Sequence, residues 1–162
     1  MLSEILTKAH AMDDATWRRH ANPWSVWTRF AILPALSLAI WSRVWIGAWC
    51  WVPIVVLVLW VWINPRAFPP PRSTRSWASR AVLGERIWTE SPRNSLAPRH
   101  RIAPYVLSVV ASLGMPYVAW GLFALHEWSL MLGLVLVILG KLWFLDRMVW
   151  LYEDSQRNSS NR

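Results

Sequence analysis

The sequence predicts an all-α integral membrane protein with four transmembrane helices arranged as two hairpins, and a short amphipathic interfacial helix in the central cytoplasmic loop. Hydrophobic residues make up 55% of the 162 residues, more than the ~45–50% typical of soluble domains. The chain also contains 15 Trp residues, and Trp anchors helices at the membrane–water boundary. The length fits a single domain, which we expect to comprise residues 1–162.

The first predicted hairpin consists of helices at about 23–42 and 48–63. Asn22 is a favourable N-cap, and Pro23 takes the first helical position, where its missing N–H is not needed. Twenty residues at about 1.5 Å each span roughly 30 Å, the thickness of a hydrocarbon core. We expect the second helix to end before Asn64, because a residue that precedes proline is disfavoured in helical geometry.

The second predicted hairpin consists of helices at about 103–125 and 128–146. Small residues on both helices predict close packing between them; they are Ser108, Ala111, Ser112, Gly114, Gly133 and Gly140. The charged stretch KLWFLDRMVWLYED begins at Lys141. Counting about 20 residues from Trp128 places the membrane boundary near Asp146. We therefore expect a cytoplasmic helix extension at 146–154, a disordered tail at 155–162, and a Lys141 side chain that reaches back to the headgroups.

The central loop, residues 64–102, is bracketed by prolines, which favour extended backbone at both of its ends. Between them, Trp77, Ala81, Gly84 and Trp88 recur at the spacing of one helix face. The loop arginines lie off this face. The pattern predicts a short helix within 73–89 that lies on the membrane surface.

The distribution of charge predicts the orientation in the membrane. Fourteen of the 17 Lys and Arg residues precede the first helix, lie in the central loop or follow the last helix, whereas the hairpin turns hold only Arg43. The positive-inside rule then places both termini and the central loop in the cytoplasm of a multi-pass protein of the inner (plasma) membrane. Twelve of the 15 Trp residues fall at the predicted membrane boundaries, which agrees with four crossings.

Composition also limits the function classes. The net charge of +8 is divided among blocks separated by apolar segments, which favours membrane lipids, anionic ones in particular, over nucleic acid. Cys50 is the only cysteine, and the four histidines show no HxxxH or HExxH spacing, so we expect no metal and no cofactor. No GxSxG elbow or Gly-rich phosphate loop is present. A homo-oligomer remains open.

Four motifs carry a resemblance to a known family: HANPWSVWTRF, NPRAFPPP, SWASRAVLGERIW and KLWFLDRMVWLYED. They resemble motifs of a family of small bacterial and archaeal integral membrane proteins whose function is unknown, over roughly residues 17–154. The resemblance implies an integral membrane fold. It implies no activity, substrate or catalytic residue.

All four motifs lie at the predicted cytoplasmic face, where acids of the helix extension meet arginines of the loop. Our main hypothesis is a protein of unknown biochemical role whose Arg-rich face contacts anionic lipid or a partner. The alternative is a membrane-embedded enzyme acting on a phosphorylated or carboxylated lipid, with arginines gripping the anion and His20 or Glu85 transferring protons. The candidate polar cluster comprises His20, Arg29, Arg66, Arg80, Glu85, Arg86, Asp146, Arg147, Glu153 and Asp154. The sequence assigns no catalytic residue and does not decide whether the protein is an enzyme.

Overall fold

The computed structural model describes residues 14–92 and 96–160. Within these ranges the chain is helical and contains no β-strand, which confirms the all-α prediction. The elements are α2 (Asp14–His20), α3 (Pro23–Trp41), α4 (Arg43–Ile46), the 3-10 helix η1 (Gly47–Cys50), α5 (Trp51–Ala67), α6 (Trp77–Glu90), α7 (Pro98–Ala124) and α8 (Glu127–Ser160).

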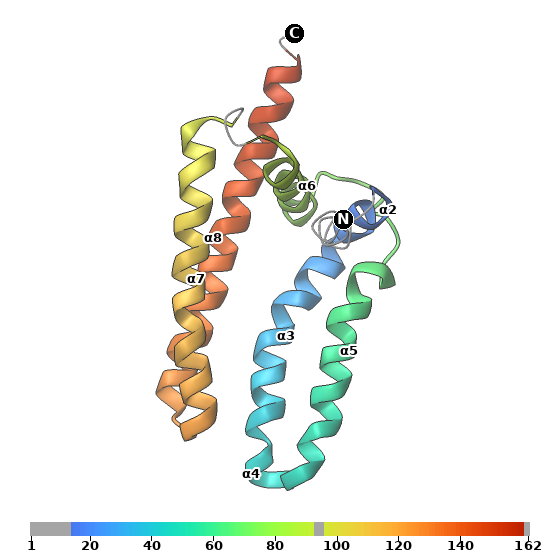
Figure 1. The fold of residues 1–162 in the computed structure, drawn as a ribbon. Coiled ribbons are helices and arrows are strands. Elements are labelled where there is room, and N and C mark those ends of the chain that lie inside the picture. Colours follow the sequence, from blue (N-terminus) through green and yellow to red (C-terminus); the bar gives the residue numbers. More distant parts are fainter. Residues whose placement is uncertain (1–13, 93–95, 161–162) are drawn as a thin grey trace, which may run out of the picture.

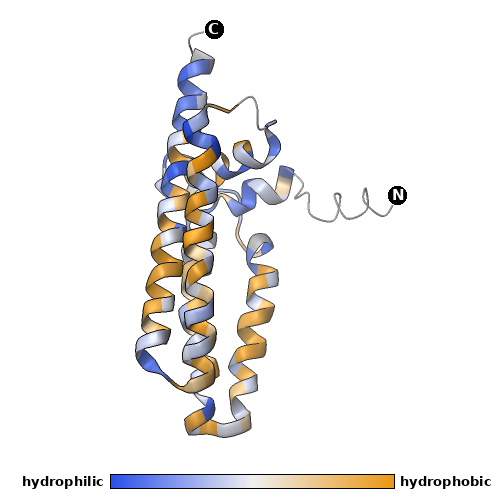
Figure 2. Cartoon of the chain, turned by 60° about the vertical axis from the view of Figure 1, so that its left-hand side comes forward, coloured by the Kyte–Doolittle hydropathy of each residue, from blue (hydrophilic) through white to orange (hydrophobic). Residues whose placement is uncertain are grey.

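Four long helices stand in two pairs, α3 beside α5 and α7 beside α8 (Figure 1). The connection between α3 and α5 and the turn between α7 and α8 lie at the same end of the molecule. The short helices α2 and α6 lie at the opposite end, α6 next to the carboxyl-terminal half of α8 and α2 next to α3 and α5. The long helices are predominantly apolar, and polar residues gather around α2, α6 and the end of α8 (Figure 2).

In the described part of the chain, three helical stretches are long and apolar enough to cross a membrane: Pro23–Asn64, Pro98–Ala124 and Glu127–Asn158. The first stretch contains both α3 and α5. The helix is interrupted there at Gly47, whose φ of +57° lies in the left-handed region that glycine adopts without steric cost. Length and composition thus agree with a membrane protein.

The first pair is held at its polar end by asparagines. Asn22 caps α3 as predicted, since its Oδ1 accepts a hydrogen bond from the Trp24 N–H at 3.0 Å. Asn64 is fully buried; its Oδ1 accepts from the Ser25 hydroxyl at 2.9 Å, and its Nδ2 donates to Thr28 Oγ1 at 2.7 Å. The prediction that the helix ends before Asn64 is wrong, because α5 continues to Ala67. These contacts to α3 hold Asn64 in the helix and outweigh the local effect of the following proline.

The helices of the second pair approach each other closely, as their small residues predicted. A Cβ added at Gly114 would lie 2.7 Å from the carbonyl oxygen of Gly133, and one added at Gly140 would lie 2.8 Å from the Cβ of Ala111. No larger side chain fits at these positions without separating α7 from α8.

Both helices of this pair are longer than predicted. α7 begins at Pro98 rather than at 103, so the expectation of extended backbone before 103 is wrong for 98–102. Pro98 takes the first turn of the helix, the same position that Pro23 takes in α3. The prediction of a disordered tail is wrong for residues 155–160, which continue α8, because Gln156 and Arg157 are good helix formers. Residues 93–95 and 161–162 lie outside the described residues.

Helix α6 uses the predicted face, but against a different neighbour. Ala81 and Gly84 are buried and Trp77 is half-buried. We expected this face to lie on the membrane surface; it packs instead on α8, so closely that a Cβ at Gly84 would lie 1.9 Å from the carbonyl oxygen of Met148. The same face completes a core that joins α2, α3, α6 and α8, formed by Trp17, Ala21, Val26, Ala78, Ala81, Val82, Leu145 and Val149.

Candidate functional site

The ten candidate residues do not form one cluster. Four of them lie in ion pairs around α6 and α8, and two make other contacts on α8. One lies apart at the end of α5, and three meet inside the polar end of the molecule. These three, His20, Arg29 and Glu85, are joined there by Lys141, which was not among the candidates.

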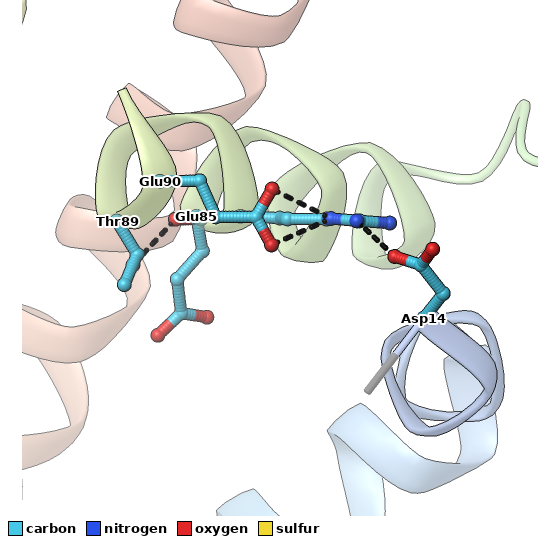
Figure 3. Close-up of polar contacts among 5 residues, drawn as sticks. Asp14, Glu85, Thr89 and Glu90 are labelled. Carbon is cyan, nitrogen blue, oxygen red and sulfur yellow. Dashed lines mark hydrogen bonds and ion pairs between the residues drawn. The ribbon is translucent and has the colours of Figure 1, made fainter. Parts of the chain in front are cut away.

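The ion pairs link α6 and α7 to α8 and to α2. Arg80 pairs with Glu153, and Asp154 accepts from Arg99 at 2.6 Å and lies 2.7 Å from His100 Nε2. Arg86 behaves in the same way (Figure 3): its Nε lies 3.0 Å from both carboxylate oxygens of Glu90, and its Nη2 donates to the Asp14 carboxylate. These ion pairs connect α6 to α8 and α2, although the buried Nε of Arg80 has no hydrogen-bond partner in the part of the chain that the structure describes.

Three further candidates lie outside these ion pairs. Trp77 Nε1 donates to Asp146 Oδ1 at 3.3 Å, a hydrogen bond that ties α6 to α8. The Arg147 guanidinium lies 4.4 Å from the ring centroid of Trp150, and its buried Nε has no hydrogen-bond partner among the described residues. Arg66 lies over the Trp62 ring on the exposed end of α5, so it takes no part in the other groups.

A groove of about 570 Å³ runs between α7 and α8 at their polar end, and we call it the α7–α8 groove. Arg99 and Arg147 line it together with apolar side chains, among them Ile102, Val106 and Trp143. The lining of this groove is thus mostly apolar, with two cationic side chains among it.

We define the charge cluster as His20 from α2, Arg29 from α3, Glu85 from α6 and Lys141 from α8. The buried His20 and the half-buried Arg29 are in direct contact: Arg29 Nη1 hydrogen-bonds to His20 Nε2 at 2.5 Å. Arg29 Nε also donates to the Ser25 carbonyl oxygen, one turn earlier, at 3.1 Å. The guanidinium therefore extends toward the polar end of α3, the direction expected for an arginine near a membrane boundary.

Lys141 reaches from α8 to α3 rather than along its own helix. Its Nζ lies 5.1 Å from the ring centroid of Phe30, within the range of a cation–π contact. The Lys141 side chain also lines a second groove, of about 260 Å³, whose other walls come from α7 and α8. We call this the lateral groove. Lys141 is the exposed member of the charge cluster, so it connects the cluster to this groove.

Glu85 supplies the carboxylate of the cluster. Figure 3 shows that its side chain points away from Glu90 and Asp14, and the carboxylate has no hydrogen-bond partner among residues 14–92 and 96–160. Burial raises the pKa of Glu85, and the positive charges of Arg29 and Lys141 offset this only in part. Glu85 is thus a carboxyl group that takes up a proton more readily than an exposed glutamate.

His20 is held in its neutral form. Burial lowers its pKa to about 3, and the nearby charges of Arg29 and Lys141 act in the same direction. Because Nε2 accepts the hydrogen bond from Arg29, the ring proton belongs on Nδ1, and buried Nδ1 has no partner in the described structure.

The cluster as a whole contains two cationic side chains, one carboxyl group and one neutral imidazole. This combination can bind an anion and can exchange a proton through Glu85. The described residues contain no group of three or more His, Cys, Asp or Glu side chains that could hold a metal ion. Sequence reasoning missed Lys141, although its charge within an apolar segment was visible.

The apolar helices and the charged layer at one end define a helical protein of the kind that membranes accommodate. The chain belongs to a family of unknown function, DUF6653, whose match covers residues 1–162. This confirms the resemblance to a family without an assigned function. No curated protein and no solved structure matches the chain.

Proposed function

We propose that this protein is a four-crossing protein of the plasma membrane, with its termini and central loop in the cytoplasm, whose Arg-rich inner face binds anionic phospholipid. The α7–α8 groove carries this proposal, because its apolar walls end at Arg99 and Arg147. A lipid chain would lie along the walls, and its phosphate would accept hydrogen bonds from the terminal guanidinium nitrogens of Arg99 and Arg147.

The proposal of four crossings rests on helix length and on the positions of the turns. α3 has 19 residues and α5 has 17, which at 1.5 Å each give about 28 and 25 Å, close to a hydrocarbon thickness of about 30 Å. Both turns lie at the end of the molecule opposite α2 and α6 (Figure 1). With both turns on one side of the membrane and α6 on the other, each long helix crosses once. The basic residues around α6 then favour the cytoplasm for that side.

Cysteine labelling tests this orientation. In a Cys50→Ala background, we would introduce Ala48→Cys and Glu127→Cys in the turns, and Thr74→Cys and Asn158→Cys at the polar end; all four positions are exposed. A membrane-impermeant maleimide added to intact cells should label the two turn positions. It should label the other two only after permeabilisation. Labelling of Ala48→Cys and Glu127→Cys from opposite sides would overturn the four-crossing topology.

Lipid retention tests the binding function. Native mass spectrometry of protein reconstituted with phosphatidylglycerol and phosphatidylcholine should show preferential retention of phosphatidylglycerol. Arg147→Gln should remove that preference, whereas Arg157→Gln, an exposed arginine near the end of α8, should not. Equal retention of both lipids by the wild-type protein would contradict the proposal.

A second candidate function is an enzyme that acts on a phosphorylated or carboxylated lipid. The observation in its favour is Glu85, a carboxyl group of raised pKa beside two cations, which suits a general acid or base. Purified protein incubated with phosphatidic acid should then yield a product detectable by mass spectrometry, and Glu85→Gln should abolish it. Absence of turnover across phosphorylated and carboxylated lipids would remove this candidate.

A further inference from the structure

The charge cluster holds more positive than negative charge in a partly buried place. Arg29 and Lys141 are cationic, and Glu85 is the one carboxyl group that faces them among the described residues. The other acids of α6 and of the end of α8 are engaged elsewhere: Glu90 with Arg86, Asp146 with Trp77, Glu153 with Arg80 and Asp154 with Arg99. Partly desolvated charge without a counter-ion is unfavourable, so the cluster is suited to an anion.

The cluster also contains hydrogen-bond donors that have no acceptor within the described ranges. Arg29 uses Nε and Nη1 and leaves Nη2, Lys141 Nζ makes only its contact with the Phe30 ring, and His20 Nδ1 is unpartnered. His20 is only 6% exposed, so bulk water does not readily satisfy this donor. A phosphate group, with several acceptor oxygens, fits the two charged donors of this set, Arg29 and Lys141.

The lateral groove gives this anion site an apolar extension. It begins at Lys141 and runs along α7 past Ser108 and Ser112. Both hydroxyls donate to carbonyl oxygens of their own helix at 2.8 Å, Ser108 to Pro104 and Ser112 to Ser108. The donors of these two polar residues in the groove wall are therefore already used. Such a wall is suited to a hydrocarbon chain.

We infer that the charge cluster and the lateral groove together form a binding site for a lipid with a phosphomonoester headgroup, such as phosphatidic acid. Arg29 and Lys141 hold the phosphate, Glu85 in its protonated form donates a hydrogen bond to it, and one acyl chain lies in the lateral groove. The headgroup is small because the cluster lies among four helices, α2, α3, α6 and α8, each of which contributes one of its residues. The inference rests on the membrane location proposed above, but not on the α7–α8 groove.

The experiment is a titration of detergent-purified full-length protein with phosphatidic acid, followed by native mass spectrometry and by the shift in Tm. Lys141→Gln should weaken binding roughly tenfold, because it removes one charged donor. Arg66→Gln, which changes an exposed arginine outside the cluster, should leave the affinity unchanged. Wild-type affinity in Lys141→Gln would overturn the assignment.

A second variant separates the lipid from free phosphate. Ser112→Phe fills the lateral groove from an exposed position and leaves all four cluster residues in place. It should weaken binding of phosphatidic acid but not of glycerol 3-phosphate, which lacks the chains. If inorganic phosphate binds the wild-type protein as tightly as phosphatidic acid, the site is not a lipid site. The effect of Arg147→Gln on phosphatidylglycerol retention tests the α7–α8 groove alone. Either site can therefore be refuted without refuting the other.

Discussion

Replacing Gly84 by Ala should force α6 away from α8. The new Cβ would lie 1.9 Å from the carbonyl oxygen of Met148, whereas real Cβ atoms almost never approach a heavy atom within 3.0 Å. The two backbones must therefore separate by about 1.1 Å or more, taken from the difference between these distances. The carbonyl belongs to the interior of α8 and cannot turn aside without breaking the helix.

This separation opens the core beneath α6, where Ala81 and Val82 are almost fully buried. Overpacking of a tight interface costs about 1–3 kcal/mol, and we expect Gly84→Ala to fall in the upper half of that range because the clash is with backbone.

The assay is thermal unfolding in detergent, combined with limited trypsin digestion of the segment around α6. Gly84→Ala should lower Tm and accelerate cleavage near α6. Thr89→Ala, an exposed change on the same helix, should alter neither. An unchanged Tm together with unchanged digestion in Gly84→Ala would refute the close contact between α6 and α8.

Three further changes test other parts of the structure. His20→Gln should reduce the acid sensitivity of the fold: unfolded His20 takes up a proton below pH 6.5 but folded His20 only near pH 3, so acidification from about pH 7.5 to 5 should cost the wild-type about 2 kcal/mol more than the variant. The raised pKa of Glu85 has the opposite effect, since it favours the folded state on acidification, and this effect is the same in wild-type and variant. Parallel Tm–pH curves for the two proteins would contradict a buried neutral His20. Asn64→Leu should lower stability by about 1 kcal/mol, seen as a lower Tm, because it removes one buried and one partly buried hydrogen bond; an unchanged Tm would show that these bonds do not stabilise the pair. A double-mutant cycle of Arg80→Gln and Glu153→Gln should yield a coupling below about 1 kcal/mol, because both side chains are more than one third exposed; a larger coupling would mean that the pair is desolvated.

The parts of the fold that depend on local signals could be predicted from the sequence. Asn22 followed by Pro23 marks the start of α3, and the small residues of α7 and α8 indicate their contact. The extension of α5 past Asn64 could not be predicted, because it depends on hydrogen bonds to residues 36 and 39 positions away. The preference of a residue before proline for non-helical geometry is outweighed by these two hydrogen bonds between helices.

The neighbour of α6 was predicted wrongly for a related reason. An apolar helix face is suited to lipid and to another helix alike, so its spacing alone does not choose between them. Gly84 was the available hint, because a glycine within a helix face gains nothing from lipid but permits close approach of another backbone.

The sequence predicted which types of residue make up the candidate site but not which of them lie together. The sequence suggests that arginines and acids meet at one face, yet which of them pair depends on how each helix is rotated about its axis. Arg86 pairs with Glu90 and Asp14, whereas Glu85, its neighbour in sequence, faces Arg29 and Lys141. Lys141 was assigned to the headgroups because its partners come from three other helices.

The contact between α6 and α8 also constrains the order of events during biosynthesis. The residues of α8 that cover Gly84, around Met148, leave the ribosome long after α6 does. Until then the buried face of α6 has only α2 and α3 to pack on, through Trp17, Ala21 and Val26, and its contact around Gly84 is missing. The central loop therefore reaches its final place only once the last helix has been made, and a chain cut short before Leu145 would lack the part of the core that α8 supplies.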